Sequence, residues 1–272
     1  MIDASADSLV AGVRMIRLRL LAALVLVALA AGIGYSQRTP GSGEPGQRTE
    51  KVEFQLARVI YRTVGGGGSR GFINPWWAID YPGAEAHFLP ALARLTRIET
   101  SKDSRHLWLS DPELFNFPFL LLQQPGRGRW TPDEKEARQL HEYLARGGFL
   151  LVDDFQGEYD FDAVQRAMHS VMPEREIVEI PAGDSLGRLV YNLQDRVQIP
   201  GRRHVYGGRV SMNGEPHWRG IYNDRGRLFA GFNFNMDMGD GWEHADDPEY
   251  PAEMTGQAYR LGVNYVVYAM TH

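Results

Sequence analysis

Residues 117–154 read FPFLLLQQPGRGRWTPDEKEARQLHEYLARGGFLLVDD, and this stretch decides the fold. Its first six residues, FPFLLL, and the FLLV run at residues 149–152 are almost uninterrupted apolar segments. Such runs are typical of strands that are buried on both faces of a parallel sheet. The stretch therefore predicts two neighbouring buried strands, the second of which is closed by Asp153 and Asp154.

The segment between these two strands predicts a helix. Thr131 suits the N-cap position, Pro132 the first helical position, and Glu134 completes a capping box. Leu140 and Leu144 lie at the spacing of one apolar helix face. The glycine pair at residues 147 and 148 then ends the helix.

The remaining segments continue the alternation of strands and helices. We expect strands at residues 54–61 and 176–180, helices at residues 83–96, 161–171 and 257–270, and a hairpin over residues 221–232. This alternation favours a parallel sheet that is covered by helices on both faces. We predict an α/β three-layer sandwich with a mostly parallel central sheet, formed by a single domain over residues 51–272.

The N-terminal segment has the layout of a secretory signal. A short basic region precedes an uncharged run of Leu, Ala and Val, and small residues follow it. The apolar run is somewhat short for a spanning helix, so residues 1–36 are either a cleaved signal peptide or an N-terminal anchor. Residues 37–50 are predicted to be a flexible linker. We expect an exported protein, periplasmic or anchored to the inner membrane, that touches the membrane only through this segment.

Composition narrows the classes of function. The chain has 272 residues, with 29 Lys and Arg against 34 Asp and Glu, so its formal net charge is −5. This acidic balance argues against a nucleic-acid partner. The chain has no cysteine, which excludes disulfides, thiolate zinc sites and a cysteine nucleophile.

Several segments resemble a family of bacterial exported proteins of unknown function. They are GFINPWWAIDYPGAEAHF at residues 71–88, GGFLLVDDF at residues 147–155 and NYVVYAMTH at residues 264–272. The stretch over residues 111–154 also resembles the class I glutamine-amidotransferase-like (flavodoxin-like) fold. The resemblance implies that fold, and family genes often lie near ATPases and von Willebrand-type proteins, which implies a role in envelope assembly.

The resemblance does not extend to amidotransferase chemistry. Those enzymes place a cysteine on a tight strand-to-helix turn, and this chain has neither a cysteine nor a G-x-S-x-G elbow that could replace it. Glutamine hydrolysis by the usual mechanism is therefore excluded.

Four polar segments follow predicted strands and should gather at one edge of the sheet, where ligands bind in this class of fold. The first contains a glycine tract with Arg70, which could wrap an anion or be a mobile loop, and then Trp76, Trp77 and Asp80. Of the two tryptophans, one could line a cleft while the other packs in the core, or both could be core residues. We take these four residues as candidates for binding a ligand or partner.

The second segment is residues 123–129, and acidic residues follow the two remaining strands. Asp153 and Asp154 could bind a ligand or a cation, or act only in turn formation. The loop after residue 233 contains Asp237, Asp240, Glu243 and His244, whose oxygen-rich set suits a divalent cation such as Ca²⁺ or Mg²⁺. The alternative is a solvated acidic loop.

These patterns leave open whether the protein is an enzyme. The leading hypothesis is an exported, non-catalytic binding or assembly module of the cell envelope, with an envelope protein or a small ligand as partner. The alternative is a metal-dependent envelope hydrolase, in which Asp153, Asp154, Asp237 and Asp240 hold a cation and His244 or Glu243 is the general base. A carbohydrate-binding protein is a third, weaker interpretation that rests on aromatic residues near carboxylates.

Overall fold

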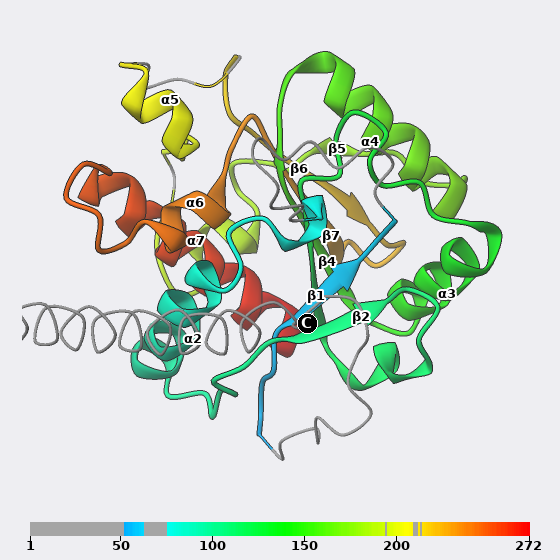
Figure 1. Ribbon diagram of the computed structural model, residues 1–272. Helices are drawn as coiled ribbons and strands as arrows, with labels where there is room; N and C mark the ends of the chain where they lie inside the picture. The colour runs from blue at the N-terminus through cyan, green and yellow to red at the C-terminus, as the bar shows by residue number, and fades with distance from the viewer. Residues whose placement is uncertain (1–51, 63–74, 194, 209–211, 213) are drawn as a thin grey trace, which may run out of the picture. The chain divides into compact units, whose positions relative to one another are not determined.

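The computed structural model describes residues 52–62, 75–193, 195–208, 212 and 214–272, all of which belong to a compact unit over Thr49–His272 (Figure 1). The predicted signal peptide or anchor, the linker, and the glycine tract with Arg70 lie outside the described residues. Within the described part, no helix is both long enough and apolar enough to cross a membrane.

In this part of the chain, seven strands form one sheet in the order β2-β1-β3-β4-β7-β6-β5. They are β1 (Ala57–Ile60), β2 (Arg105–Trp108), β3 (Phe119–Gln123), β4 (Phe149–Phe155), β5 (Val178–Glu179), β6 (His217–Tyr222) and β7 (Leu228–Phe234). The first five strands in spatial order are parallel, whereas β6 and β5 extend the sheet in antiparallel fashion.

Helices cover both faces of this sheet (Figure 1). The α-helices are α2 (Gly83–Thr96), α3 (Glu134–Ala145), α4 (Gly157–Val171), α5 (Arg202–Tyr206), α6 (Met238–Glu243) and α7 (Ala252–Thr271), and the 3-10 helices are η1 (Trp76–Ala78), η2 (Pro112–Asn116) and η3 (Ser185–Arg188). Leu120 and Leu150 pack in one apolar core with α3 and α4, whereas Leu121 and Leu151 pack in a second core with α2 and α7. Successive strand residues thus point to opposite faces, and the predicted α/β three-layer sandwich with a mostly parallel sheet is confirmed.

The observed elements differ from the predicted ones in several details, two of which concern the candidate site and the helix before β4. The helix expected to be capped by Thr131 has Asp133 as its N-cap, and Asp133 forms the capping box with Glu136 rather than with Glu134. A carboxylate is the stronger acceptor and its charge suits a helix N-terminus, which explains why Asp133 takes this position. In addition, β4 continues through Asp153 and Asp154 to Phe155.

The topology brings the carboxyl ends of β1, β3, β4 and β7 to one edge. β1 lies between β2 and β3, so the connection from β1 to β2 and the connection from β2 to β3 run in opposite directions across the sheet. Such a topological switch point is where ligands bind in open α/β sheets.

The segment after β7 is held at this edge by the buried carboxylate of Asp153. Its Oδ2 accepts hydrogen bonds from the backbone N–H groups of Met238 (2.8 Å) and Gly239 (3.0 Å), at the start of α6. Its Oδ1 accepts a third bond from the amide of Asn233 in β7 (2.9 Å), and Tyr265 of α7 donates to the same Asn233 side chain. One carboxylate therefore joins β4, β7 and α6.

We predict that Asp153→Ala lowers the free energy of unfolding by about 2–4 kcal/mol, because it leaves three buried donors without an acceptor. Urea unfolding of the full-length chain measures this change. The control is Asp224→Ala, which removes an exposed carboxylate that pairs with Arg175. An equal, small effect of both substitutions would show that Asp153 does not hold α6 in place.

Candidate functional site

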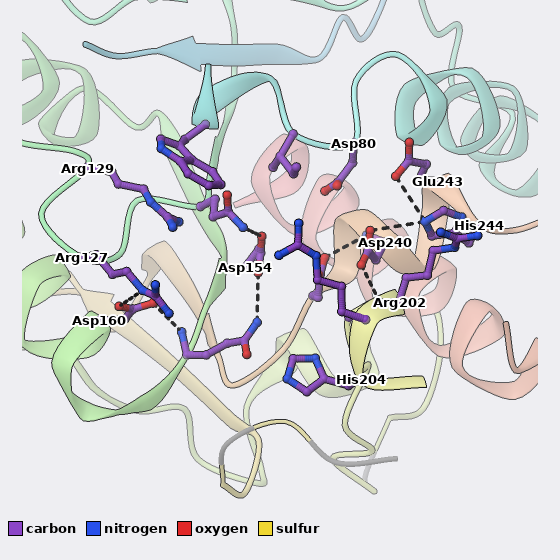
Figure 2. A pocket seen from close by; sticks show the side chains of 17 residues that line it. Asp80, Arg127, Arg129, Asp154, Asp160, Arg202, His204, Asp240, Glu243 and His244 are labelled. Carbon is purple, nitrogen blue, oxygen red and sulfur yellow. Dashed lines mark hydrogen bonds and ion pairs between the residues drawn. The ribbon is translucent and has the colours of Figure 1, made fainter. Parts of the chain in front are cut away.

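A polar cavity of about 460 Å³ lies at the carboxyl edge of the sheet (Figure 2). Every described polar segment that follows β1, β3, β4 and β7 contributes to its wall, and so does the start of α5. The acidic lining residues are Asp80, Asp154, Asp160, Asp237, Asp240 and Glu243, and the basic ones are Arg127, Arg129, Arg202, Arg203, His204 and His244. Most of the lining residues therefore carry ionisable side chains, and both signs of charge are present.

Asp80 is positioned by a buried arginine on β1. The Arg58 side chain pairs with Glu85 of α2 (2.7 Å) and donates to the carbonyl oxygens of Trp77 (3.1 Å) and Ile79 (2.9 Å). These bonds fix the chain immediately before Asp80, whose backbone has a left-handed φ of 63°. The Asp80 carboxylate then accepts a hydrogen bond from Gln123 (2.9 Å), at the end of β3.

Gly239 allows α6 to approach this carboxylate. A Cβ atom at position 239 would collide with Asp80 Oδ2 and with the amide nitrogen of Gln123. Only glycine lets the backbone of α6 lie against Asp80, which brings the acidic residues of α6 next to it.

Asp154 enters the cavity because β4 is irregular at this point. The register of β4 against β7 shifts between Val152 and Phe155, and Asp154 adopts a left-handed φ of 54°. Asp153 therefore faces α6, whereas Asp154 lines the cavity, where it accepts hydrogen bonds from the amides of Gln124 (2.6 Å) and Gln156 (3.3 Å). Left-handed non-glycine residues are costly and cluster at functional sites.

The acidic segment after β7 forms the remaining wall. Asp237 is the N-cap of α6, and its Oδ1 accepts the backbone N–H of Asp240 (2.9 Å). The Asp240 carboxylate accepts the backbone N–H of Arg202 (2.6 Å) and lies 3.6 Å from His244. Asp237 is buried rather than solvated, so the alternative of a solvated acidic loop does not describe it.

Burial and mutual repulsion raise the pKa values of these carboxyl groups. Burial raises the pKa of Asp80 and Asp237 well above the usual value, and neighbouring carboxylates raise both further. Burial, together with the charges of Asp240 and Asp153, raises the pKa of Asp154 to about 7. The pKa of Glu243 is also raised, chiefly by burial. The charged form of this cluster is therefore costly unless a proton or a cation neutralises it.

The carboxylates also lie at distances that suit a metal ion. One oxygen each from Asp80, Asp237 and Asp240 lie within 4.8 Å of one another, and so do ligand atoms of Asp240, Glu243 and His244. Two oxygens that bind one cation at about 2.0–2.6 Å can be at most about 5 Å apart. Both groups satisfy this limit, and Asp240 belongs to both.

The structure separates the predicted site residues into two sets. Asp80, Asp154, Asp237, Asp240, Glu243, His244 and Trp76 line the cavity. Trp77 instead packs in the core against His106, and both carboxylate oxygens of Asp153 are used to hold α6 and Asn233. The placement of Arg70 is not described.

Five of the six basic lining residues were not among the candidates chosen from the sequence. Arg127 and Arg129 lie in the loop after β3, and Arg202, Arg203 and His204 lie on or beside α5. The segment over residues 123–129 was expected at the ligand-binding edge because it follows a buried strand, but its two arginines were not singled out. No comparable pattern marks α5, which reaches the cavity only through the tertiary fold.

Comparison with known families gives a match over most of the chain. Residues 55–270 match a family described as "Domain of unknown function (DUF4159)". No curated protein matches the chain.

We predict that the metal-free protein is more stable at pH 5 than at pH 8, in part because of Asp154. Its pKa is about 7 in the folded protein against an ordinary value of 3.8, so the folded state binds a proton that the unfolded chain releases. This contribution to stability is lost as pH rises through about 7.

The measurement is urea unfolding in the presence of a chelator at both pH values. Asp154→Asn should reduce the difference in unfolding free energy between them by about 2–3 kcal/mol. An unchanged difference in this variant would show that Asp154 is already ionised at pH 5.

Proposed function

The chain belongs to the DUF4159 family of domains of unknown function, since the match covers most of its length, and we propose that it is a divalent-cation-dependent ligand-binding module of the cell envelope. In this proposal Asp80, Asp237 and Asp240 bind the cation, and the cavity beside them holds a small ligand. The fold is a class I amidotransferase-like scaffold without its cysteine, and the protein is exported, as its N-terminal sequence predicts.

The observation that carries the proposal is that two of these carboxyl groups, Asp80 and Asp237, are buried without a basic partner among the described residues. Within the described part of the chain, neither Asp80 nor Asp237 forms an ion pair with Lys, Arg or His, although both are buried. Buried charges are normally paired or coordinate a metal. A divalent cation between these oxygens would remove the repulsion and lower the raised pKa values of Asp80 and Asp237.

The donor set favours a hard cation. Carboxylate oxygens are the preferred ligands of Mg²⁺, Ca²⁺ and Mn²⁺, and His244 is the one nitrogen ligand in either described group. With no thiolate and a single imidazole, the set does not resemble a zinc site.

The lining also argues for binding rather than nucleophilic catalysis. The described lining residues include no Ser, Thr, Cys, Lys or Tyr. The usual covalent chemistry of the amidotransferase-like scaffold therefore has no obvious nucleophile in this cavity.

A second candidate is a metal-dependent envelope hydrolase, and Asp154 favours it. This carboxyl group faces the same cavity as the proposed cation site, so it is placed to accept a proton from a water molecule bound there. Asp154 would then act on a water molecule that the cation activates. Metal-dependent turnover of 4-nitrophenyl phosphate or 4-nitrophenyl acetate that Asp154→Asn abolishes would favour this candidate over a binding module.

We predict that the full-length chain binds Mg²⁺, Ca²⁺ or Mn²⁺ with one ion in the cavity. Isothermal titration calorimetry at pH 7.5 should show that Asp80→Asn and Asp240→Asn each weaken binding at least about tenfold, because each removes a charged ligand. Asp162→Asn is the matched control, since Asp162 is an exposed residue of α4 outside the cavity. Equal affinity of all four proteins, or no binding of any of these ions by the wild-type chain, would contradict the proposal.

A further inference from the structure

Arg129 is a second prominent feature of the cavity. Its guanidinium lies 3.7 Å from the ring centre of Trp76, so the two planar groups are in close contact. Both side chains are half-buried and both line the cavity. In the view of Figure 2, Arg127 and Arg129 lie at one end of the cavity, and Glu243 and His244 lie at the other.

The loop that carries Arg129 is firmly anchored. Its next residue, Trp130, is fully buried, and its backbone N–H donates to the carbonyl of Pro125 (3.2 Å). Arg129 N–H closes a turn onto the carbonyl of Gly126 (3.1 Å), and Gly126 packs so tightly against Asp160 that a Cβ atom there would clash. Arg129 is therefore held in place by its loop and by Trp76, which lowers the entropic cost of using it to bind a ligand.

The guanidinium of Arg129 lacks an acceptor among the described residues. Its neighbour Arg127 lies 3.7 Å from Asp160, and Arg202 lies 3.5 Å from Asp247, but Arg129 forms no hydrogen bond or ion pair with another described side chain. Contact with Trp76 covers one face of the guanidinium and leaves its in-plane N–H donors for another group. Burial lowers the pKa of Arg129, and repulsion by Arg127 contributes to the same shift.

We propose that Arg129, stacked on Trp76, binds an oxyanion, a phosphoryl or carboxyl group, of the ligand that occupies the cavity. The planar fork of an arginine matches two oxygens of such a group, and stacking on an aromatic ring is an arrangement that lysine cannot reproduce. An anion at this point also relieves the repulsion between Arg129 and Arg127.

Binding of an oxyanion by Arg129 would define the class of ligand in the proposed function. Only the part that involves a bound cation rests on that proposed function. A ligand that carries an oxyanion can contact Arg129 through one part and the cation on Asp80, Asp237 and Asp240 through another. Without the cation, ionised carboxylates at Asp80, Asp237 and Asp240 would repel the rest of an anionic ligand. Cation and oxyanion should therefore bind cooperatively.

The experiment is calorimetric titration of the full-length chain with inorganic phosphate and, separately, with succinate, each with and without Mg²⁺. Arg129→Gln should weaken binding of the preferred anion at least about tenfold, since it removes a charged two-point contact. Arg129→Lys should recover only part of this loss, because it keeps the charge but not the fork. Arg138→Gln is the matched control, since Arg138 is exposed on α3 and pairs with Glu134.

Titration with Mg²⁺ alone separates the two proposals. Unchanged Mg²⁺ affinity in Arg129→Gln together with weakened anion binding supports the assignment of Arg129. Anion binding that depends on Arg129 but not on Mg²⁺ also supports it, while overturning the cation-dependent function. Anion binding that is equal in wild type and Arg129→Gln, or no binding of either anion by the wild type, overturns the assignment whatever Mg²⁺ does.

Discussion

The buried carboxylate of Asp153 is the interaction on which the arrangement of the cavity depends. It accepts bonds from β7 and from the first turn of α6, and so fixes where the chain goes after it leaves the sheet. Asp237, Asp240 and Glu243 all lie on or beside that short helix. Burial raises the pKa of Asp153 to about 6, while the three donors favour its ionised form. Asp153 thus positions the acidic residues of α6, while its own oxygens are occupied by hydrogen bonds within the protein.

Most of the fold could be predicted from the sequence, because long apolar runs indicate buried strands and glycine residues indicate where helices and strands end. It did not predict β2, whose RHLW sequence mixes polar and apolar residues at the edge of the sheet. The helix start was displaced by two residues, because Thr131 and Asp133 each stand three positions before a glutamate. The local sequence pattern predicts that a helix begins in this region. Which of the two residues becomes the N-cap depends on the strength and charge of its side-chain acceptor.

The site was predictable at the level of segments and less so at the level of side chains. The segments after β1, β3, β4 and β7 do converge, as parallel topology requires. Which member of an adjacent pair faces the cavity depends on backbone irregularity that no spacing rule reveals. The bulge in β4 turns Asp154 towards the cavity and Asp153 away from it, and the 3-10 helix η1 does the same for Trp76 and Trp77. The result is a cavity in which, among the described residues, Asp80 and Asp237 form no ion pair and Arg129 has no side-chain acceptor.

The central claim is that a divalent cation binds between Asp80, Asp237 and Asp240. Anomalous diffraction from crystals of the full-length chain grown with Mn²⁺ tests it most directly. The account predicts an anomalous peak about 2.0–2.6 Å from carboxylate oxygens of these three residues. Well-ordered carboxylates with no peak between them, or a peak only elsewhere on the protein, would contradict it.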